Sequence, residues 1–298
     1  MTETATATRT IAHISDLHFG TEDRAIAAAL LAELDGTGAP APSVVAISGD
    51  LTQRARPEQF RAARAFLDSL PGPCVVVPGN HDVPLYHLFD RFVRPLQRYR
   101  HFMREPLMPV HADRELAVFG VTTAHGFTFK GGRITREITE TVAAAAAPIE
   151  AGWKVLVAHH PFVLPANGDP SDRVRGADEA VPILEEAGIE VILTGHLHVA
   201  YSSDPTAFRS DDRAVIQVHA GTAISQRRRG EPNGYNLLTF AGDEVAIAHR
   251  VWDGARFVAQ TTKSYRRAPG DPDGARTTGS TPAPHFTRTG ETWERTPP

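Results

Sequence analysis

Short apolar runs alternate with helical patterns through the first two-thirds of the chain. The apolar runs predict strands at residues 10–16, 43–50, 74–82, 154–160 and 190–198. Each run is apolar at nearly every position, which is typical of a sheet covered on both faces. Between the runs, apolar residues at helical spacing predict helices at residues 22–34, 57–70, 135–147 and 177–187. This alternation indicates an α/β fold.

The pattern changes after residue 214. The segments AVIQVHAG and GYNLLTFAGDEVAIAHRVWDGARFV contain apolar runs separated by the turn signals AGD and DG. Such turns between short apolar runs favour antiparallel hairpins. We expect these strands to form a second sheet or to extend the first.

Two further segments lie outside the alternation. Residues 85–112 carry aromatic and aliphatic residues at helical spacing together with Arg and His, and we expect them to form a helical cap. This cap is inserted in a domain that we predict to span residues 8–266. Residues 267–298 are rich in Pro, Gly, Thr and Arg, with little apolar periodicity, and are expected to form a flexible tail.

Composition narrows the class of protein. The 298 residues include 31 Lys and Arg against 35 Asp and Glu, a formal net charge of −4, so no broad cationic surface is expected for binding nucleic acid. No apolar run approaches the 18 or more residues of a membrane span, and the first residues do not resemble a secretory signal. The single cysteine, Cys74, lies in an apolar run and is expected to be a core residue. We expect a cytoplasmic protein without a membrane partner.

Polar residues able to bind metal follow the five strands predicted first. They are Asp16 and His18, Asp50, Asn80 and His81, His159 and His160, and His196 and His198. The carboxyl ends of strands in open α/β sheets are where ligands bind, so these side chains are expected to converge on one edge.

A structural role is the common explanation for each residue taken alone. An Asp after a strand is more often a turn or cap residue, and a single His is more often packed or hydrogen-bonded. Their conjunction at five strand ends nevertheless favours a metal site. One ion needs three or four ligands, whereas this set offers at least seven of mixed oxygen and nitrogen type, which suits two adjacent divalent ions with Asp50 able to bridge them.

The motifs DLH (16–18), GDL (49–51), GNHD (79–82), HHP (159–161) and GHLH (195–198) together resemble the signature of the calcineurin-like metallophosphoesterases. Within that superfamily they are most similar to the bacterial class III cyclic-nucleotide phosphodiesterases. The resemblance implies an α/β four-layer αββα sandwich, with two mostly mixed β-sheets and a dinuclear site at its rim.

The resemblance also implies a role for each matched residue. One metal ion would be held by Asp16, His18, Asp50 and His198, and the other by Asp50, Asn80, His159 and His196. The family pattern HxP makes His159 the ligand and leaves His160 as its neighbour. His81 would contact the substrate and not a metal ion.

Two divalent ions lower the pKa of a bound water to roughly 7 and clamp the oxygens of an in-line displacement at phosphorus. We therefore predict a phosphodiesterase that acts on small diesters such as cyclic nucleotides, with His81 placed to protonate the leaving alkoxide. A phosphomonoesterase, a nucleotide pyrophosphatase, a nuclease and a non-catalytic interaction module remain open alternatives. Nucleic acid is not excluded as a substrate, because metal ions add positive charge that residue counts ignore.

Several properties are left open by the sequence. The ligand set suits Mn, Fe, Zn, Co or Ni, so the identity of the two divalent transition-metal ions is not predicted. The oligomeric state is also open. Arg173, Arg175 and Arg227 to Arg229 lie in loops that could meet a phosphate or remain hydrated.

Overall fold

The computed structural model describes residues 7–37, 41–103, 106–127, 130–203, 209–210, 213–267, 285–289 and 292–296. Its strands form two larger sheets and one short two-stranded sheet. In the first sheet the order is β15-β16-β14-β13-β12-β1-β2-β3, and in the second it is β4-β5-β6-β7-β11-β8. Both sheets are mixed. In the first, β1, β2 and β3 are parallel neighbours at one edge, and the pairs from β1 through β12 and β13 to β14 are antiparallel. In the second, the parallel neighbours β5, β6, β7 and β11 are flanked by the antiparallel strands β4 and β8.

The first sheet consists of β1 (Arg9–Ile14), β2 (Val44–Ile47), β3 (Cys74–Val76), β12 (Gly234–Ala241), β13 (Glu244–Trp252), β14 (Phe257–Arg266), β15 (His285–Thr289) and β16 (Thr292–Thr296). The second consists of β4 (Val110–Ala112), β5 (Leu116–Gly120), β6 (Trp153–Val157), β7 (Val191–Thr194), β8 (Tyr201–Ser202) and β11 (Ile216–His219). The two-stranded sheet pairs β9 (Arg209–Ser210) with β10 (Arg213–Ala214).

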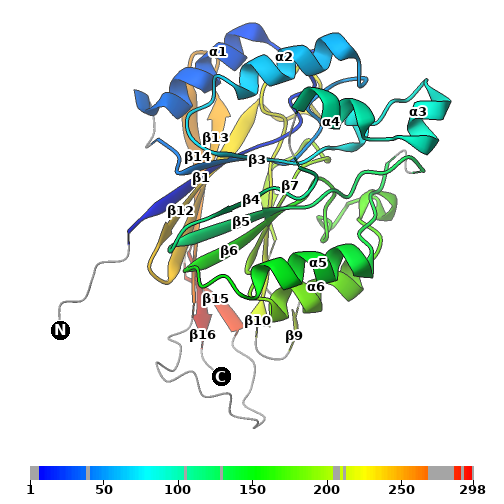
Figure 1. Ribbon diagram of the computed structural model, residues 1–298. Coiled ribbons are helices and arrows are strands. Elements are labelled where there is room, and N and C mark those ends of the chain that lie inside the picture. The colour runs from blue at the N-terminus through cyan, green and yellow to red at the C-terminus, as the bar shows by residue number, and fades with distance from the viewer. Residues whose placement is uncertain are drawn as a thin grey trace.

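The helices are α1 (Arg24–Ala32), α2 (Pro57–Leu67), α3 (Leu88–Val93), α4 (Gln97–Met103), α5 (Arg136–Ala146) and α6 (Ala177–Glu186). Three shorter helical segments, Glu33–Thr37, Asn80–Asp82 and Pro170–Asp172, complete the described helical structure. Figure 1 shows α1 and α2 on one side of the sandwich and α5 and α6 on the opposite side.

The described residues of the four layers form three hydrophobic cores. Alternate residues of a strand point to opposite faces, so Ala12 of β1 packs toward the helices while Ile11 packs between the sheets. In the second sheet Val155 lies between the sheets, and Leu156 faces the layer of α5 and α6. Burial on both faces explains why these strands are apolar at nearly every position. The predicted αββα sandwich with two mixed sheets is confirmed.

Local signals begin and end the helices near the expected positions. The side chain of Asp23 accepts hydrogen bonds from the backbone N–H groups of Ala25 and Ile26 and caps α1. Thr135 caps α5 in the same way. Of the two segments expected to form antiparallel hairpins after residue 214, the second forms β12, β13 and β14, which extend the first sheet. The first, AVIQVHAG, instead contains β11, which joins the second sheet parallel to β7.

The remaining segments differ in part from the sequence expectations. The predicted cap contains the helices α3 and α4, but its last residues form β4, which already belongs to the second sheet. β5 was not predicted. In the segment expected to be a tail, β15 and β16 pair with each other, and β16 pairs with β14.

No helix among the described residues has the length and apolar content needed to cross a membrane.

Candidate metal centre

The loops that follow β1, β2 and β3 in one sheet meet those that follow β6 and β7 in the other. These loops carry all seven residues that the sequence proposes as metal ligands. Six of the seven are buried, and Asn80 is half-buried. The convergence follows from the topology, because parallel strands bring their carboxyl ends to the same edge of a sheet.

A first group of donor atoms surrounds Asp16. Its Oδ1 lies 3.6 Å from Nε2 of His18 and 3.7 Å from Nε2 of His198. Oδ2 of Asp50 lies 3.6 Å from the same His18 nitrogen. These separations are too long for hydrogen bonds. They are close to the spacing of about 3–3.5 Å between donors that share one ion at about 2.1 Å.

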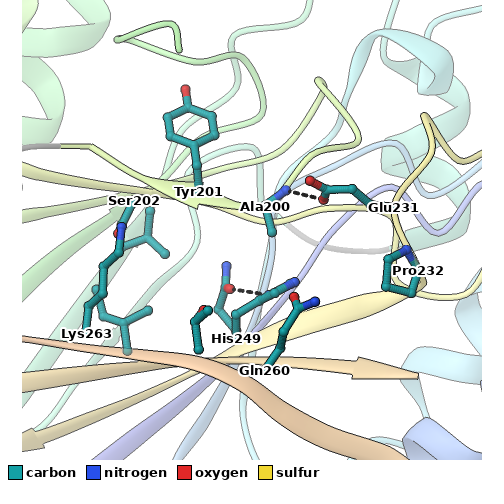
Figure 2. Close-up of a pocket in the computed structure, with 12 residues that line it drawn as sticks. Ala200, Tyr201, Ser202, Glu231, Pro232, His249, Gln260 and Lys263 are labelled. Carbon is teal, nitrogen blue, oxygen red and sulfur yellow. Dashed lines mark hydrogen bonds between the residues drawn. The ribbon is translucent and has the colours of Figure 1, made fainter. Parts of the chain in front are cut away.

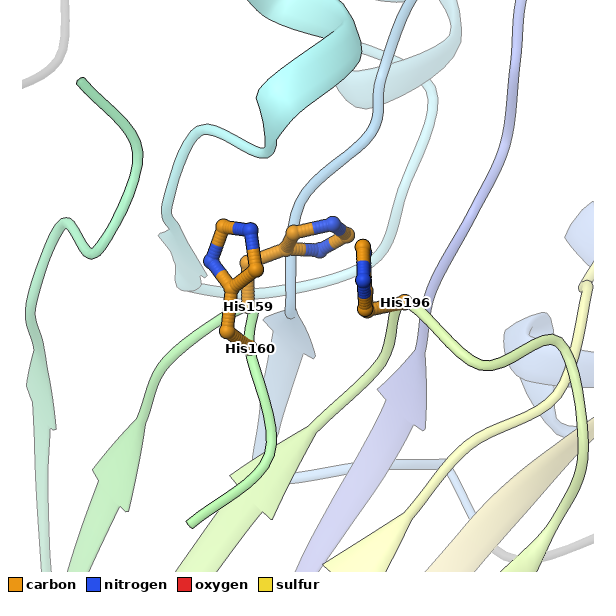
Figure 3. Close-up of side chains that lie close together, drawn as sticks. All are labelled: His159, His160 and His196. Atoms are coloured by element: carbon orange, nitrogen blue, oxygen red, sulfur yellow. The ribbon is translucent and has the colours of Figure 1, made fainter. Parts of the chain in front are cut away.

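A second group of donor atoms surrounds Asn80. Its Oδ1 lies 3.1 Å from Nε2 of His159 and 3.1 Å from Nδ1 of His196. Oδ1 of Asp50 lies 3.4 Å from the same His159 nitrogen. The two carboxylate oxygens of Asp50 therefore face different groups. Figure 3 shows His159 and His196 close together beyond the strands that carry them.

Three buried polar atoms at the first group have no hydrogen-bond partner among the described residues. They are Oδ1 of Asp16 and both ring nitrogens of His18. An unsatisfied buried polar group costs about 1–3 kcal/mol, so such atoms are uncommon in a folded core. The other oxygen of Asp16 accepts hydrogen bonds from Ser15 Oγ at 2.7 Å and from the backbone N–H of His196 at 3.0 Å. Asp16 and His18 therefore fit a divalent cation, which would bind the remaining oxygen, Oδ1 of Asp16.

The backbone is strained at the same residues. Positive φ angles occur at five of the seven proposed ligands: Asp16 (53°), His18 (45°), Asp50 (52°), His196 (79°) and His198 (60°). Residues other than glycine seldom adopt this left-handed conformation, which costs of order 1–3 kcal/mol at each position. Such strain clusters at functional sites, where the surrounding structure maintains it.

The electrostatics of the carboxylates suit cation binding. Burial by itself raises the pKa of Asp16 and of Asp50, but nearby histidines outweigh it. His198 and His18 hold the pKa of Asp16 well below its usual range, and His159 and His81 hold the pKa of Asp50 at about 2. Both carboxylates are thus ionised at neutral pH.

Neighbouring polar groups orient the histidines. Nδ1 of His159 donates to the backbone carbonyl of Ser48 at 2.7 Å, so Nε2 is the ring nitrogen that faces the second group. The Thr222 hydroxyl donates to the carbonyl of Arg227 at 3.0 Å and accepts from Nδ1 of His198 at 2.6 Å. His198 therefore presents its Nε2 to Asp16. Fixing one ring nitrogen by a hydrogen bond so that the other can bind metal is typical of histidine ligands.

Asp82, in the GNHD motif, connects the two loops that follow β2 and β3. Its buried carboxylate accepts from the backbone N–H groups of Leu51, Thr52 and Gly79 at 3.1, 2.8 and 2.9 Å. It also accepts from the Thr52 hydroxyl at 2.9 Å. Burial and the Asp50 charge raise the pKa of Asp82 to about 6. These bonds fix the loop that carries Asp50 relative to the loop that carries Asn80.

Two motif glycines allow the loops to approach closely. A Cβ atom on Gly79 would lie 2.4 Å from the backbone nitrogen of Asp50. On Gly195 it would lie 1.8 Å from Ser15 Oγ and 2.7 Å from Oδ2 of Asp16. Any larger residue at these positions would displace a carboxylate of the site.

His81 lies beside both groups and is half-buried. Its ring meets that of His18 edge to face, with centroids 4.9 Å apart. Nδ1 donates to the carbonyl of Gln53 at 2.9 Å, so the lone pair of the neutral ring is on Nε2, 2.9 Å from Nη1 of Arg227. Burial lowers the pKa of His81. Its backbone N–H donates to Oδ1 of Asp50 at 2.8 Å.

Other candidates from the sequence have structural contacts. Both ring nitrogens of His160 are hydrogen-bonded, to the Thr123 hydroxyl and to the Lys130 carbonyl, each at 2.8 Å. His160 thus supports the loop, although its ring lies near those of His159 and His196 (Figure 3). Arg173 is engaged by Asp178 and by a backbone carbonyl.

Sequence reasoning missed three residues that support the site. Thr222 and Ser48 orient histidines, and Asp172 lies with Oδ1 3.3 Å from Nε2 of His196. Thr222 follows the carboxyl end of β11, so the rule that found the other strand ends could have found it. Asp172, in a short helical turn, has no comparable pattern.

A separate cavity of about 310 Å³ lies between the sheets and contains none of the seven proposed ligands. β8 and β11 contribute to one side, and β12, β13 and β14 to the other (Figure 2). Near it Glu231 accepts a hydrogen bond from the backbone N–H of Ala200, and His249 contacts Asn236. The cavity borders the segment after GHLH but is not part of the metal centre.

Residues 9–200 match the family model described as calcineurin-like phosphoesterase. One relative is the glycerophosphodiester phosphodiesterase GpdQ of Enterobacter lignolyticus (strain SCF1), 34% identical over 95 residues, or 29% of this chain and 33% of that protein. The match thus spans a third of that relative. Another is a probable cyclic nucleotide phosphodiesterase of a Synechococcus species, 24% identical over 205 residues, or 65% of this chain and 75% of that protein.

The fold also matches solved structures. The purple acid phosphatase PPD1 from yellow lupin (Lupinus luteus) seeds superposes with a TM-score of 0.63 at 11% identity. The alignment covers 89% of this chain and 55% of that one. At this identity the likeness concerns the fold alone.

Proposed function

The chain belongs to the calcineurin-like phosphoesterase family, and we propose that it is a phosphodiesterase acting on small diesters such as cyclic nucleotides. Proteins of this family use a dinuclear divalent metal centre, and the described residues include the histidine and aspartate clusters that such a centre needs. Metal-dependent hydrolysis of phosphoesters is the activity that these findings support.

The observation that carries the proposal is the set of buried donor atoms around Asp16 and Asp50. Oδ1 of Asp16 and the ring nitrogens of His18 have no hydrogen-bond partner among the described residues. The two oxygens of Asp50 face His18 and His159. We propose that Asp16, His18, Asp50 and His198 hold one ion, and Asp50, Asn80, His159 and His196 the other.

When bound, two divalent ions supply a hydroxide at neutral pH and positive charge for the oxygens on phosphorus. Mn, Fe, Zn, Co and Ni all suit this mixture of nitrogen and oxygen donors. The chain's own residues then orient the substrate and transfer a proton to the leaving group.

His81 is our candidate for the proton donor to the leaving group. The Gln53 carbonyl holds the proton on Nδ1, so Nε2 is the atom that first takes a second proton from solvent water and then gives it to the leaving alkoxide. This nitrogen lies 2.9 Å from Nη1 of Arg227. A positioned donor of this kind typically contributes about 10²- to 10⁴-fold to the rate.

The preference for small diesters draws on the two relatives, whose names specify a glycerophosphodiester and a cyclic nucleotide as substrates. It also draws on the net charge of −4, which disfavours long polyanions. A small pocket of about 90 Å³ beside His81, lined in part by Gln53, Asn80 and Leu85, is of a size that suits a small leaving group.

The test combines metal analysis with a substrate panel. Purified protein should contain close to two transition-metal ions per chain by mass spectrometry. It should hydrolyse bis-p-nitrophenyl phosphate and cyclic AMP with higher kcat/KM than p-nitrophenyl phosphate and single-stranded DNA. The control is an Asp50→Ala variant, whose residual rate reports any contaminating phosphatase.

Two outcomes would overturn parts of the proposal. Faster turnover of the monoester than of every diester would refute the diesterase assignment while leaving a phosphoester hydrolase. Protein loaded with two ions that cleaves none of the esters would refute the catalytic function itself.

A further inference from the structure

The loop after β11 brings an arginine to the substrate side of the site. Nη1 of Arg227 lies 2.9 Å from Nε2 and 3.3 Å from Nδ1 of His81, although 146 positions separate the two residues. The His81 ring in turn contacts that of His18. Arg227 is therefore one side chain away from the proposed ligands.

His81 is a weak hydrogen-bond acceptor for the guanidinium of Arg227. The backbone carbonyl of Gln53 can only accept, so Nδ1 of His81 carries a proton and its Nε2 offers a lone pair to Arg227. Among the described residues, no carboxylate lies within 4.0 Å of Arg227, whereas Arg173 at the other loop is paired with Asp178. A phosphate oxygen is a charged acceptor that matches the planar donor fork of arginine better than a neutral imidazole does.

The backbone of Arg227 is fixed relative to the site. Its carbonyl accepts from Thr222 Oγ1 at 3.0 Å, and the same hydroxyl accepts from the ring of His198. The preceding residue donates its backbone N–H to the carbonyl of Thr21 at 2.9 Å. The side chain is exposed while the main chain is held, which is what a residue that reaches for a diffusible ligand requires.

We infer that Arg227 is a substrate-binding residue whose guanidinium leaves His81 and binds phosphoryl oxygens when a phosphoester enters the site. This inference rests on the proposed function. The exchange uncovers Nε2 of His81 for the leaving group and adds positive charge where negative charge develops at phosphorus. No covalent bond is made or broken by Arg227.

The test compares Arg227→Ala with Arg228→Ala, which removes the same charge from the next residue. Arg228 is exposed, and the described contacts of its side chain include none to His81. Two measurements are made on protein loaded with metal: binding of inorganic phosphate by calorimetry, and kcat/KM with bis-p-nitrophenyl phosphate.

Loss of a charge-assisted contact predicts phosphate binding about 10- to 100-fold weaker in Arg227→Ala, with kcat/KM lowered by a similar factor. Metal content should be unchanged, and Arg228→Ala should remain within about twofold of wild type in both assays. Arg227→Lys keeps the charge without the planar fork and should fall between Ala and wild type. Added guanidinium ion should partly restore Arg227→Ala and have no effect on Arg228→Ala.

Equal phosphate affinity in Arg227→Ala and Arg228→Ala would overturn the inference. So would a loss of metal from Arg227→Ala, which would show a structural role through Thr222. If wild type binds phosphate but hydrolyses no ester, the proposed function fails, and the calorimetric comparison still decides whether Arg227 binds phosphate.

Discussion

Replacing Asp82 by Ala should destabilise the loops that hold Asp50 and Asn80. The carboxylate is fully buried and accepts four hydrogen bonds, three of them from backbone N–H groups. Alanine leaves those three donors without their acceptor. Each unsatisfied buried donor costs about 1–3 kcal/mol, and because such costs are not additive we expect a total loss of about 3–5 kcal/mol in the free energy of unfolding.

The loss is measurable by thermal unfolding. For a chain of this size, about 2 °C accompanies each kcal/mol, so the midpoint should fall by about 8 °C. Circular dichroism in the presence of a chelator measures the change in midpoint that comes from the lost hydrogen bonds, without a contribution from bound metal. Inductively coupled plasma mass spectrometry of the variant without chelator should then show reduced metal content, because the loops that carry Asp50 and Asn80 are no longer fixed relative to one another.

Asp68→Ala provides the matched control. Asp68 pairs with Arg64 at 2.7 Å on the surface of α2, with 65% of its side chain exposed, and exposed pairs of this kind contribute at most about 1 kcal/mol. Asp82→Ala with the same unfolding midpoint as Asp68→Ala would refute the reasoning, because it would mean that the carboxylate does not hold the loops together.

Three further predictions concern the site and the core. Asp50→Ala should abolish activity and lower the content of both ions, and a variant that keeps two ions would contradict the bridging role. His81→Ala should keep its metal and lose about 10²- to 10⁴-fold in kcat, whereas metal loss would show that His81 is a ligand. Burial lowers the pKa of His13 to about 3, so from about pH 6.5 downward the unfolded chain takes up a proton that the folded chain does not. Stability in chelator should therefore fall as pH drops from about 6.5 toward 3, and less steeply in His13→Gln; parallel pH profiles would exclude this cause.

Local patterns predicted the strands that contribute most to the site. β1, β2, β3, β6 and β7 all lie within the apolar runs or one residue from them, because both faces of each strand are buried. β5 is buried at every position as well. It escaped prediction because a run of five apolar residues next to an aromatic helical segment has no distinctive periodicity.

The site was predictable to the extent that its residues follow strands. Asp16, Asp50 and His159 could be placed together because the ends of parallel strands meet. Asp172 and Arg227 could not, because their positions depend on how long loops fold back over that edge. Their contacts with His196 and His81 span 24 and 146 positions, and no local pattern encodes such a distance.

The need for donor atoms gives a physical reason why residues other than glycine adopt positive φ angles in these loops. Asp16, Asp50 and His196 adopt φ angles that glycine would accept without strain, yet each position carries a side chain with a donor atom. Glycine would remove about 1–3 kcal/mol of strain at each of them and would remove the donor as well. Packing alone would favour that exchange. The presence of strained aspartates and histidines, beside glycines that let the loops approach, is therefore explained by a requirement for their donor atoms at this one place.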